Sequence, residues 1–198
     1  MLCGFGLITV PSMFFHETEL SGLFIIDPEL IEDERGFFSC VFRADEFARI
    51  GLNGNLRQNN IAFNAHRGTL RGMHFQKQPY EQAKLTRCTR GAIYDVVIDL
   101  RPGSPTRYRW AGVELSSDNC RMLYIPQGFA HGYQTLTDNT EVFYQASEYY
   151  HPESAGGLKW NDPAFDIRWP LPVTVMNERD ANYPLLESDK LHHREPER

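Results

Sequence analysis

Short strand-like runs, spaced roughly ten residues apart, constrain the fold of this chain more than any other feature. Alternation places successive side chains on opposite faces of an extended strand, and Pro-Gly, Gly-Ser and Asp-Asn turns separate the runs. This spacing is typical of a β-sandwich or jelly roll. We expect strands at residues 23–27, 36–43, 57–63, 69–76, 82–89, 92–100, 109–115, 121–125, 131–136 and 140–149.

A single segment, residues 44–50, has the pattern of a short helix, which Gly51 would end. With 198 residues, of which 41% are hydrophobic, the chain is long enough to bury one sizeable core. We therefore expect one all-β domain over residues 19–186, with few and short helices. Residues 1–18 are predicted to be an N-terminal extension, and residues 187–198 a polar C-terminal tail.

Charge and apolar content exclude two classes of partner. The formal net charge is -6, whereas proteins that coat nucleic acid normally carry a basic stripe. No apolar run approaches the roughly 18 residues that a transmembrane helix needs, so we expect no membrane partner. The cysteines are far apart and form no C-x-x-C pair, which indicates reduced thiols in a cytoplasmic protein. They are Cys3, Cys40, Cys88 and Cys120.

Residues 67–85 contain the strongest candidate site, because this segment sets basic side chains along two consecutive expected strands. Strand alternation allows His74 and Lys84 to point into the same concavity, which would place a titratable base beside a fixed cation. A second cluster, residues 125–136, returns His131 at the start of another strand. Two histidines on neighbouring strands of an all-β chain therefore define a candidate site.

Eight motifs, in order, carry a resemblance to a known family. They are DERGFF, TLRGMHFQ, QAKLTRC, IYDVVIDLRPGSPT, IPQGFAHGYQTL, VFYQASEYY, WNDPAFDIRWP and NERDANYPLL. Over residues 20–186 the chain resembles the dTDP-4-dehydrorhamnose 3,5-epimerases. This resemblance implies a double-stranded β-helix, which is a cupin-like jelly roll, and a homodimer. It also implies an isomerase of dTDP-rhamnose biosynthesis, a deoxysugar route to cell-surface polysaccharide. Such an enzyme epimerises a nucleotide-linked 4-keto-6-deoxyhexose at C3, C5 or both, with no metal or other cofactor.

The chemistry of that reaction explains the residue types that the family uses. A C4 ketone makes the protons on C3 and C5 removable, because the carbanion delocalises onto the ketone oxygen. In family register, His74 matches the base and Asp180 its acidic partner. Tyr144 matches the proton donor, and Lys84 matches the cation near the ketone oxygen.

Other matches assign the binding of the nucleotide diphosphate and the sugar. Arg35 and Arg71 match phosphate contacts, and a planar guanidinium suits a pyrophosphate. His131 matches a histidine near the substrate. Strict alternation would turn Arg71 away from His74, so both can line one site only if Gly72 hosts a bulge or a sharp twist. The remaining matches, a Gln-x-Asn pair near the nucleotide and an aromatic that stacks on the base, are Gln58, Asn60 and Tyr150.

Two other functions stay open on the sequence. A metal-dependent cupin, an oxygenase or isomerase, would use His74 and His131 as ligands, although Gln76 stands where an H-x-H motif would place its second histidine. A non-catalytic jelly roll would bind sugar without needing a base. The chain also departs from the family pattern at Cys40, where members carry glutamate, and at Arg179, where many carry lysine. These departures leave open whether the nucleotide is dTDP, GDP or CDP.

Overall fold

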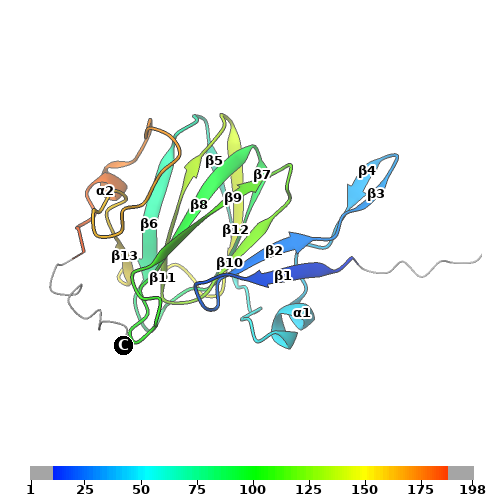
Figure 1. Cartoon of the computed structure of the whole chain (residues 1–198), viewed down its shortest axis with the longest axis horizontal. Helices are drawn as coiled ribbons and strands as arrows, with labels where there is room; N and C mark the ends of the chain where they lie inside the picture. Colours follow the sequence, from blue (N-terminus) through cyan, green and yellow to red (C-terminus); the bar gives the residue numbers. More distant parts are fainter. Residues whose placement is uncertain (1–10, 187–198) are drawn as a thin grey trace, which may run out of the picture.

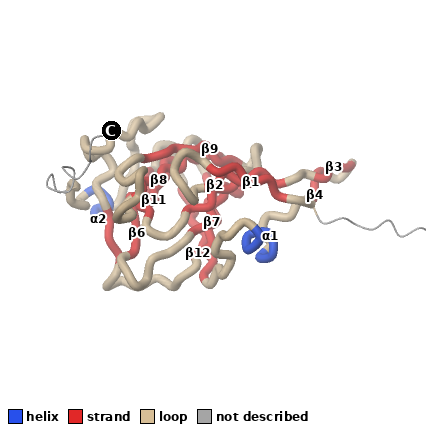
Figure 2. The backbone as a smooth tube through the Cα atoms, turned by 60° about the horizontal axis from the view of Figure 1, so that its bottom comes forward, coloured by secondary structure: helices blue, strands red, loops and turns tan. Residues whose placement is uncertain are grey.

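The computed structural model describes residues 11–186, and most of their strands belong to two facing antiparallel β-sheets (Figures 1 and 2). The strands are β1 Met13–Glu17, β2 Phe24–Pro28, β3 Ile31–Asp33, β4 Gly36–Phe38, β5 Gln58–Asn64, β6 Leu70–Gln76, β7 Lys84–Arg90, β8 Ala92–Asp99, β9 Trp110–Ser116, β10 Met122–Ile125, β11 Phe129–Thr135, β12 Thr140–Ala146 and β13 Ala155–Gly157. The helices are α1 Ala44–Arg49 and α2 Glu178–Ala181.

Strands that are distant in sequence pair within each sheet. The larger sheet has the order β1-β2-β10-β7-β12-β5, and the smaller has the order β13-β6-β11-β8-β9. Because neighbours in the sheets are mostly not consecutive in the chain, the connections cross between the two layers, as in a jelly roll. The expected all-β, cupin-like fold is confirmed.

The core lies between the sheets, where the alternating runs place their apolar side chains. Leu123 of β10, Val97 of β8 and Val142 of β12 belong to one cluster that is almost wholly buried. Burial of each such side chain contributes roughly 1.5–3 kcal/mol. Outside the larger sheet, α1 buries Phe47 completely, and the ring packs edge-on against Tyr124 at 5.8 Å between centroids. The apolar cluster fills only part of the space between the sheets, and polar side chains line the rest of it.

The elements differ from expectation in several places. Strands β3 and β13 and helix α2 were not expected, and the expected strand 140–149 ends at Ala146. The expected strand 36–43 ends at Phe38, because β3 and β4 form a separate hairpin that projects from the body of the molecule and the chain then turns into α1 (Figure 1). Within the expected extension 1–18, Met13–Glu17 form β1, which pairs along β2. Its sequence lacks regular alternation because β1 is an edge strand with few buried side chains. Residues 1–10 and the predicted tail 187–198 lie outside the described residues.

Candidate active site

A cavity of about 480 Å³ opens between the two sheets, and this volume suits a small-molecule ligand. Strands β5, β7 and β12 supply one wall, and strands β6, β11 and β13 supply the other. Of the residues matched to the family, eight line this cavity: Gln58, Asn60, Arg71, His74, Lys84, His131, Tyr144 and Tyr150. The structure therefore brings both candidate segments of the sequence to one place.

A bulge at Gly72 lets Arg71 and His74 face the same cavity. His131 and Tyr133 of β11 pair with His74 and Arg71 of β6, respectively. Between these two pairs β6 therefore contains one more residue than β11. Gly72 has a φ of +142°, and a Cβ there would lie 2.5 Å from the Cα of Gly132. Only glycine fits both restraints. Of the two irregularities that the sequence allowed at Gly72, the structure contains the bulge.

His74 is held by a buried carboxylate. Its Nε2 lies 2.8 Å from Oδ1 of Asp180, and Asp180 is completely buried. The other oxygen, Oδ2, accepts the N–H of Gly72 at 3.0 Å. Asn177, the N-cap of α2, accepts the backbone N–H of Asp180 at 2.7 Å. Asp180 thus lies behind the cavity wall and fixes the orientation of the imidazole.

The charges of this pair follow from their surroundings. Burial alone would raise the pKa of Asp180, but the hydrogen bond and charge of His74 outweigh it, so the pKa lies below its usual value. Burial lowers the pKa of His74, although Asp180 opposes this shift. At neutral pH the pair is therefore a carboxylate and a neutral imidazole. Because a carboxylate only accepts, His74 carries its proton on Nε2 and keeps a lone pair on Nδ1.

The opposite wall carries an acid and a cation. Burial raises the pKa of Tyr144 in β12, so its phenol keeps its proton at neutral pH. Burial lowers the pKa of Lys84 in β7 to about 8, against the attraction of Asp95. Lys84 is still mostly an ammonium at pH 7. A base thus lies on one sheet, and a neutral acid and a cation lie on the other.

His131 has its own carboxylate partner. Its Nε2 lies 2.9 Å from Oδ1 and 3.0 Å from Oδ2 of Asp95, which is completely buried. As with His74, this contact fixes the ring. Within residues 11–186, no three His, Cys, Asp or Glu side chains are grouped so that they could hold a metal ion.

Polar side chains order the other end of the cavity. Arg71 donates from Nε to Oδ1 of Asn64 at 2.8 Å, which sets the direction of its guanidinium. Gln58 donates from Nε2 to Oδ1 of Asn60 at 2.9 Å, and its Oε1 accepts the backbone N–H of Tyr150 at 3.0 Å. The Gln-x-Asn pair is therefore joined directly to the loop that carries Tyr150.

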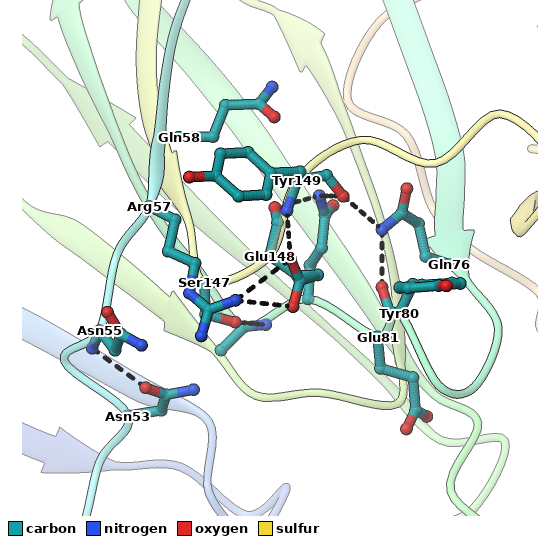
Figure 3. A network of polar contacts seen from close by, with 12 residues as sticks. Asn53, Asn55, Arg57, Gln58, Gln76, Tyr80, Glu81, Ser147, Glu148 and Tyr149 are labelled. Carbon is teal, nitrogen blue, oxygen red and sulfur yellow. Dashed lines mark hydrogen bonds and ion pairs between the residues drawn. The ribbon is translucent and has the colours of Figure 1, made fainter.

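That loop, residues 147–151, is held by a network of side chains (Figure 3). Gln76 donates to the carbonyl of Tyr149 at 3.0 Å and accepts the N–H of His151 at 2.7 Å. Arg57 pairs with Glu148 at 3.2 Å, and Gln82 donates to the carbonyl of Glu148 at 2.8 Å. Several side chains thus fix a segment that has no regular secondary structure of its own.

Two matched residues do not line this cavity: Asp180, which contacts His74 from behind the wall, and Arg35, which lies far from it. Arg35 lies at the turn of the β3–β4 hairpin, where it pairs with Asp33, and its side chain is 84% exposed. Figures 1 and 2 show the hairpin extending away from the two sheets. Within one chain, Arg35 and the cavity are separate.

Sequence reasoning missed several residues at the site. Tyr183 lines the cavity without having been considered, and Arg179, noted only as a departure from the family pattern, lines it as well. Asp95 carried a signal that could have been used, because a carboxylate inside the apolar run IYDVVID must be buried and partnered. Asn64 gave no such signal, since an asparagine at a strand end is ordinary.

Comparison with known proteins identifies the family. The model of the dTDP-4-dehydrorhamnose 3,5-epimerase family matches residues 17–188. The chain belongs to this family. A family member from Sinorhizobium fredii is 43% identical, over 91% of this chain and 93% of its own length.

Solved structures of the epimerase family share the fold. The Bacillus anthracis enzyme, with TDP and PPi bound, has a TM-score of 0.86 and 40% identity, covering 88% of this chain and 100% of its own. The Legionella pneumophila epimerase, in complex with dTDP-4-keto-L-rhamnose, has a TM-score of 0.83 and 39% identity, covering 88% and 93%. In our chain, none of the helices within residues 11–186 is long and apolar enough to cross a membrane.

Proposed function

We propose that this protein epimerises dTDP-4-dehydro-6-deoxyglucose at C3 and C5 to give dTDP-4-dehydrorhamnose, in the cytoplasm and without a cofactor. The observation that carries the proposal is the placement of His74 and Tyr144 on opposite walls of one cavity. Inversion requires a proton to leave one face of the sugar ring and to return on the other. A base and an acid that face each other across the cavity can perform both transfers.

The steps follow from the protonation states. His74 takes the proton from C3 or C5 onto Nδ1, and Asp180 stabilises the imidazolium that forms. The negative charge moves to the C4 oxygen, where the ammonium of Lys84 stabilises the enolate more than the ketone. Tyr144 then returns a proton from the opposite wall. Exchange with solvent restores the phenol and the neutral imidazole.

The nucleotide would occupy the end of the cavity near β5. Arg71 offers its guanidinium to the diphosphate, and its hydrogen bond to Asn64 holds it in position. Gln58 and Asn60 would contact the base, against which the ring of Tyr150 would stack. His131, fixed by Asp95, would contact the sugar.

We further propose a homodimer in which Arg35 serves the cavity of the partner subunit. The β3–β4 hairpin exposes Phe37 by 56% and Phe38 by 59%, and Ile61 and Phe63 on β5 are 67% and 50% exposed. Apolar exposure on a projecting hairpin and on an edge strand favours association, and two-fold dimers are the commonest closed assembly.

Mixed dimers test this arrangement. Arg35→Ala and His74→Ala should each be nearly inactive alone. After mixing and exchange of subunits, half of the dimers would be mixed, and each would contain one intact cavity. Activity should therefore recover to about a quarter of wild type. No recovery in a population shown by mass spectrometry to be mixed would contradict the proposal.

Deuterium exchange tests the reaction itself. The enzyme is incubated in D₂O with dTDP-, GDP- and CDP-linked 4-keto-6-deoxyhexoses, and NMR follows deuterium at C3 and C5. We expect incorporation at both positions and preference for the dTDP sugar. Incorporation at one carbon alone would limit the protein to a single epimerisation, and absence of exchange with every substrate would reject the proposal.

A further inference from the structure

The strand beside His74 carries no side chain at the position next to the imidazole. Gly157 in β13 is the direct partner of His74 in β6. In an antiparallel pair, facing residues place their Cβ atoms roughly 4.5–5.5 Å apart, so a side chain at position 157 would normally cover this flank of the histidine. On the other flank, β11 places His131 opposite His74.

The ring of Tyr183 occupies the space that Gly157 leaves. The Tyr183 and His74 rings meet edge to face, with centroids 5.8 Å apart and planes at 71°. A Cβ on Gly157 would lie 2.3 Å from Cε2 of Tyr183, so any side chain at position 157 would have to displace the ring. Gly157 is not among the glycines with positive φ. Its lack of a side chain therefore provides space and is not required by the backbone conformation.

Tyr183 belongs to the same short segment as the partner of the base. Asp180, which lies in α2, accepts the hydrogen bonds from His74 and Gly72, and Tyr183 follows it three residues later. Figure 1 shows α2 beside β6 and β13. The segment 180–183 thus contacts the imidazole twice: Asp180 binds Nε2, and the ring of Tyr183 packs against the ring of His74.

We propose that Tyr183 is a positioning residue for His74: its ring excludes water from one flank of the imidazole, and Gly157 is glycine in order to admit that ring. This inference rests on the proposed function only where it concerns catalysis. The contact between Tyr183 and His74 exists whatever reaction the protein performs.

The predicted effect has a definite sign, because Tyr183 changes solvation and not charge. The charged and titratable groups facing His74 are Asp180 and Arg179 from α2, Lys84 from β7 and His131 from β11. None of them is altered by a substitution at position 183. Burial also raises the pKa of Tyr183, so its phenol is neutral.

Removal of the ring should therefore let water reach His74 and stabilise the imidazolium. Burial is the largest cause of the lowered pKa of His74, so the pKa should rise toward its ordinary value. More of the base would be protonated at a given pH. The acid limb of kcat/KM should consequently move to higher pH.

The experiment titrates His74 directly. NMR of histidine-labelled, ligand-free enzyme follows the imidazole in wild type, Tyr183→Ala, Tyr183→Phe and Gly157→Ala, and a His74→Gln sample assigns the signal. Tyr183→Ala should raise the titration midpoint by about 0.5–1 pH unit, a fraction of the shifts that full burial produces. Gly157→Ala should act in the same direction by displacing the ring. Tyr183→Phe keeps the ring and should leave the midpoint in place.

Activity profiles separate this inference from the proposed function. If the midpoint of His74 and the acid limb of kcat/KM rise together in Tyr183→Ala, both are supported. If the midpoint rises and the limb does not, the ring shields His74 as inferred, but His74 is not the base. An unchanged midpoint in folded Tyr183→Ala overturns the inference, and Tyr183→Ala decides the test even if Gly157→Ala does not fold.

Discussion

Replacement of Asp180 by asparagine should disable the base without disturbing the shape of the site. The carboxylate accepts two hydrogen bonds, from Nε2 of His74 at 2.8 Å and from the N–H of Gly72 at 3.0 Å. An asparagine has one oxygen and one NH₂ group, so it can accept only one of them. The N–H of Gly72 can only donate, so the favoured orientation turns the side-chain oxygen of the asparagine toward Gly72.

The amide NH₂ of the asparagine would then face Nε2 of His74. To avoid two opposed donors, His74 must move its proton from Nε2 to Nδ1, the nitrogen that serves the substrate. The reverse orientation, with NH₂ against the N–H of Gly72, leaves a buried donor unpaired at a cost of about 1–3 kcal/mol. The first arrangement removes the lone pair from Nδ1, and the second keeps it but loses the negative charge that stabilises the imidazolium. We expect kcat to fall by roughly 10²–10⁴-fold, which is about 3–5 kcal/mol of barrier.

Binding of nucleotide should be unaffected, because Asp180 is completely buried and does not line the cavity. The assay follows loss of the C3 and C5 protons in D₂O, and calorimetry measures the Kd for TDP. Glu178→Gln is the matched control, since Glu178 is exposed on the same helix and loses the same charge. If Asp180→Asn keeps more than about a tenth of wild-type exchange, the assignment of the dyad is wrong.

Other substitutions test separate parts of the site. Tyr144→Phe should let deuterium enter the substrate faster than epimer forms, because the carbanion can still arise while its reprotonation fails; equal losses would assign Tyr144 to positioning. Lys84→Met should lower kcat by roughly 10²–10³-fold with a modest change in KM. Because the pKa of Lys84 is about 8, wild-type kcat should fall above that pH, and Lys84→Arg should move this alkaline limb upward. Gln76→Ala should weaken TDP binding more than it lowers kcat, since Gln76 holds the backbone on both sides of Tyr150. Calorimetry checks this, and an unchanged Kd would contradict it.

Short strand-like runs separated by turn residues were enough to predict most strands of both sheets, even though β10 and β11 are buried on both faces and show no alternation. The same rule failed for β1, an edge strand whose pairing depends on backbone hydrogen bonds to β2. Near the site, alternation set Arg71 and His74 on opposite faces. That conflict predicted a bulge or a sharp twist at Gly72, and the structure contains the bulge.

Side chains that act through tertiary contacts were less accessible from the sequence. Asp180 was identified only by its match to the family motif. No local sequence pattern indicates that a carboxylate will bind a histidine more than a hundred residues away. Tyr183 and Gly157 lie 26 residues apart, and neither is unusual in its own segment. Their relation to His74 exists only once β13 and the C-terminal segment pack against β6.

The bulge at Gly72 links the two ends of the site. A bulge withdraws a backbone N–H from the ladder between strands, and a buried N–H must then find another partner. Here the N–H of Gly72 donates to Oδ2 of Asp180, so the irregularity that turns Arg71 toward the cavity also anchors the carboxylate behind His74. A regular strand would lose both features at once. In the proposed function, binding of the diphosphate and removal of the proton would therefore depend on the same local geometry. Gly132 on the facing strand permits it, because a Cβ there would lie 2.9 Å from the Cα of Gly72.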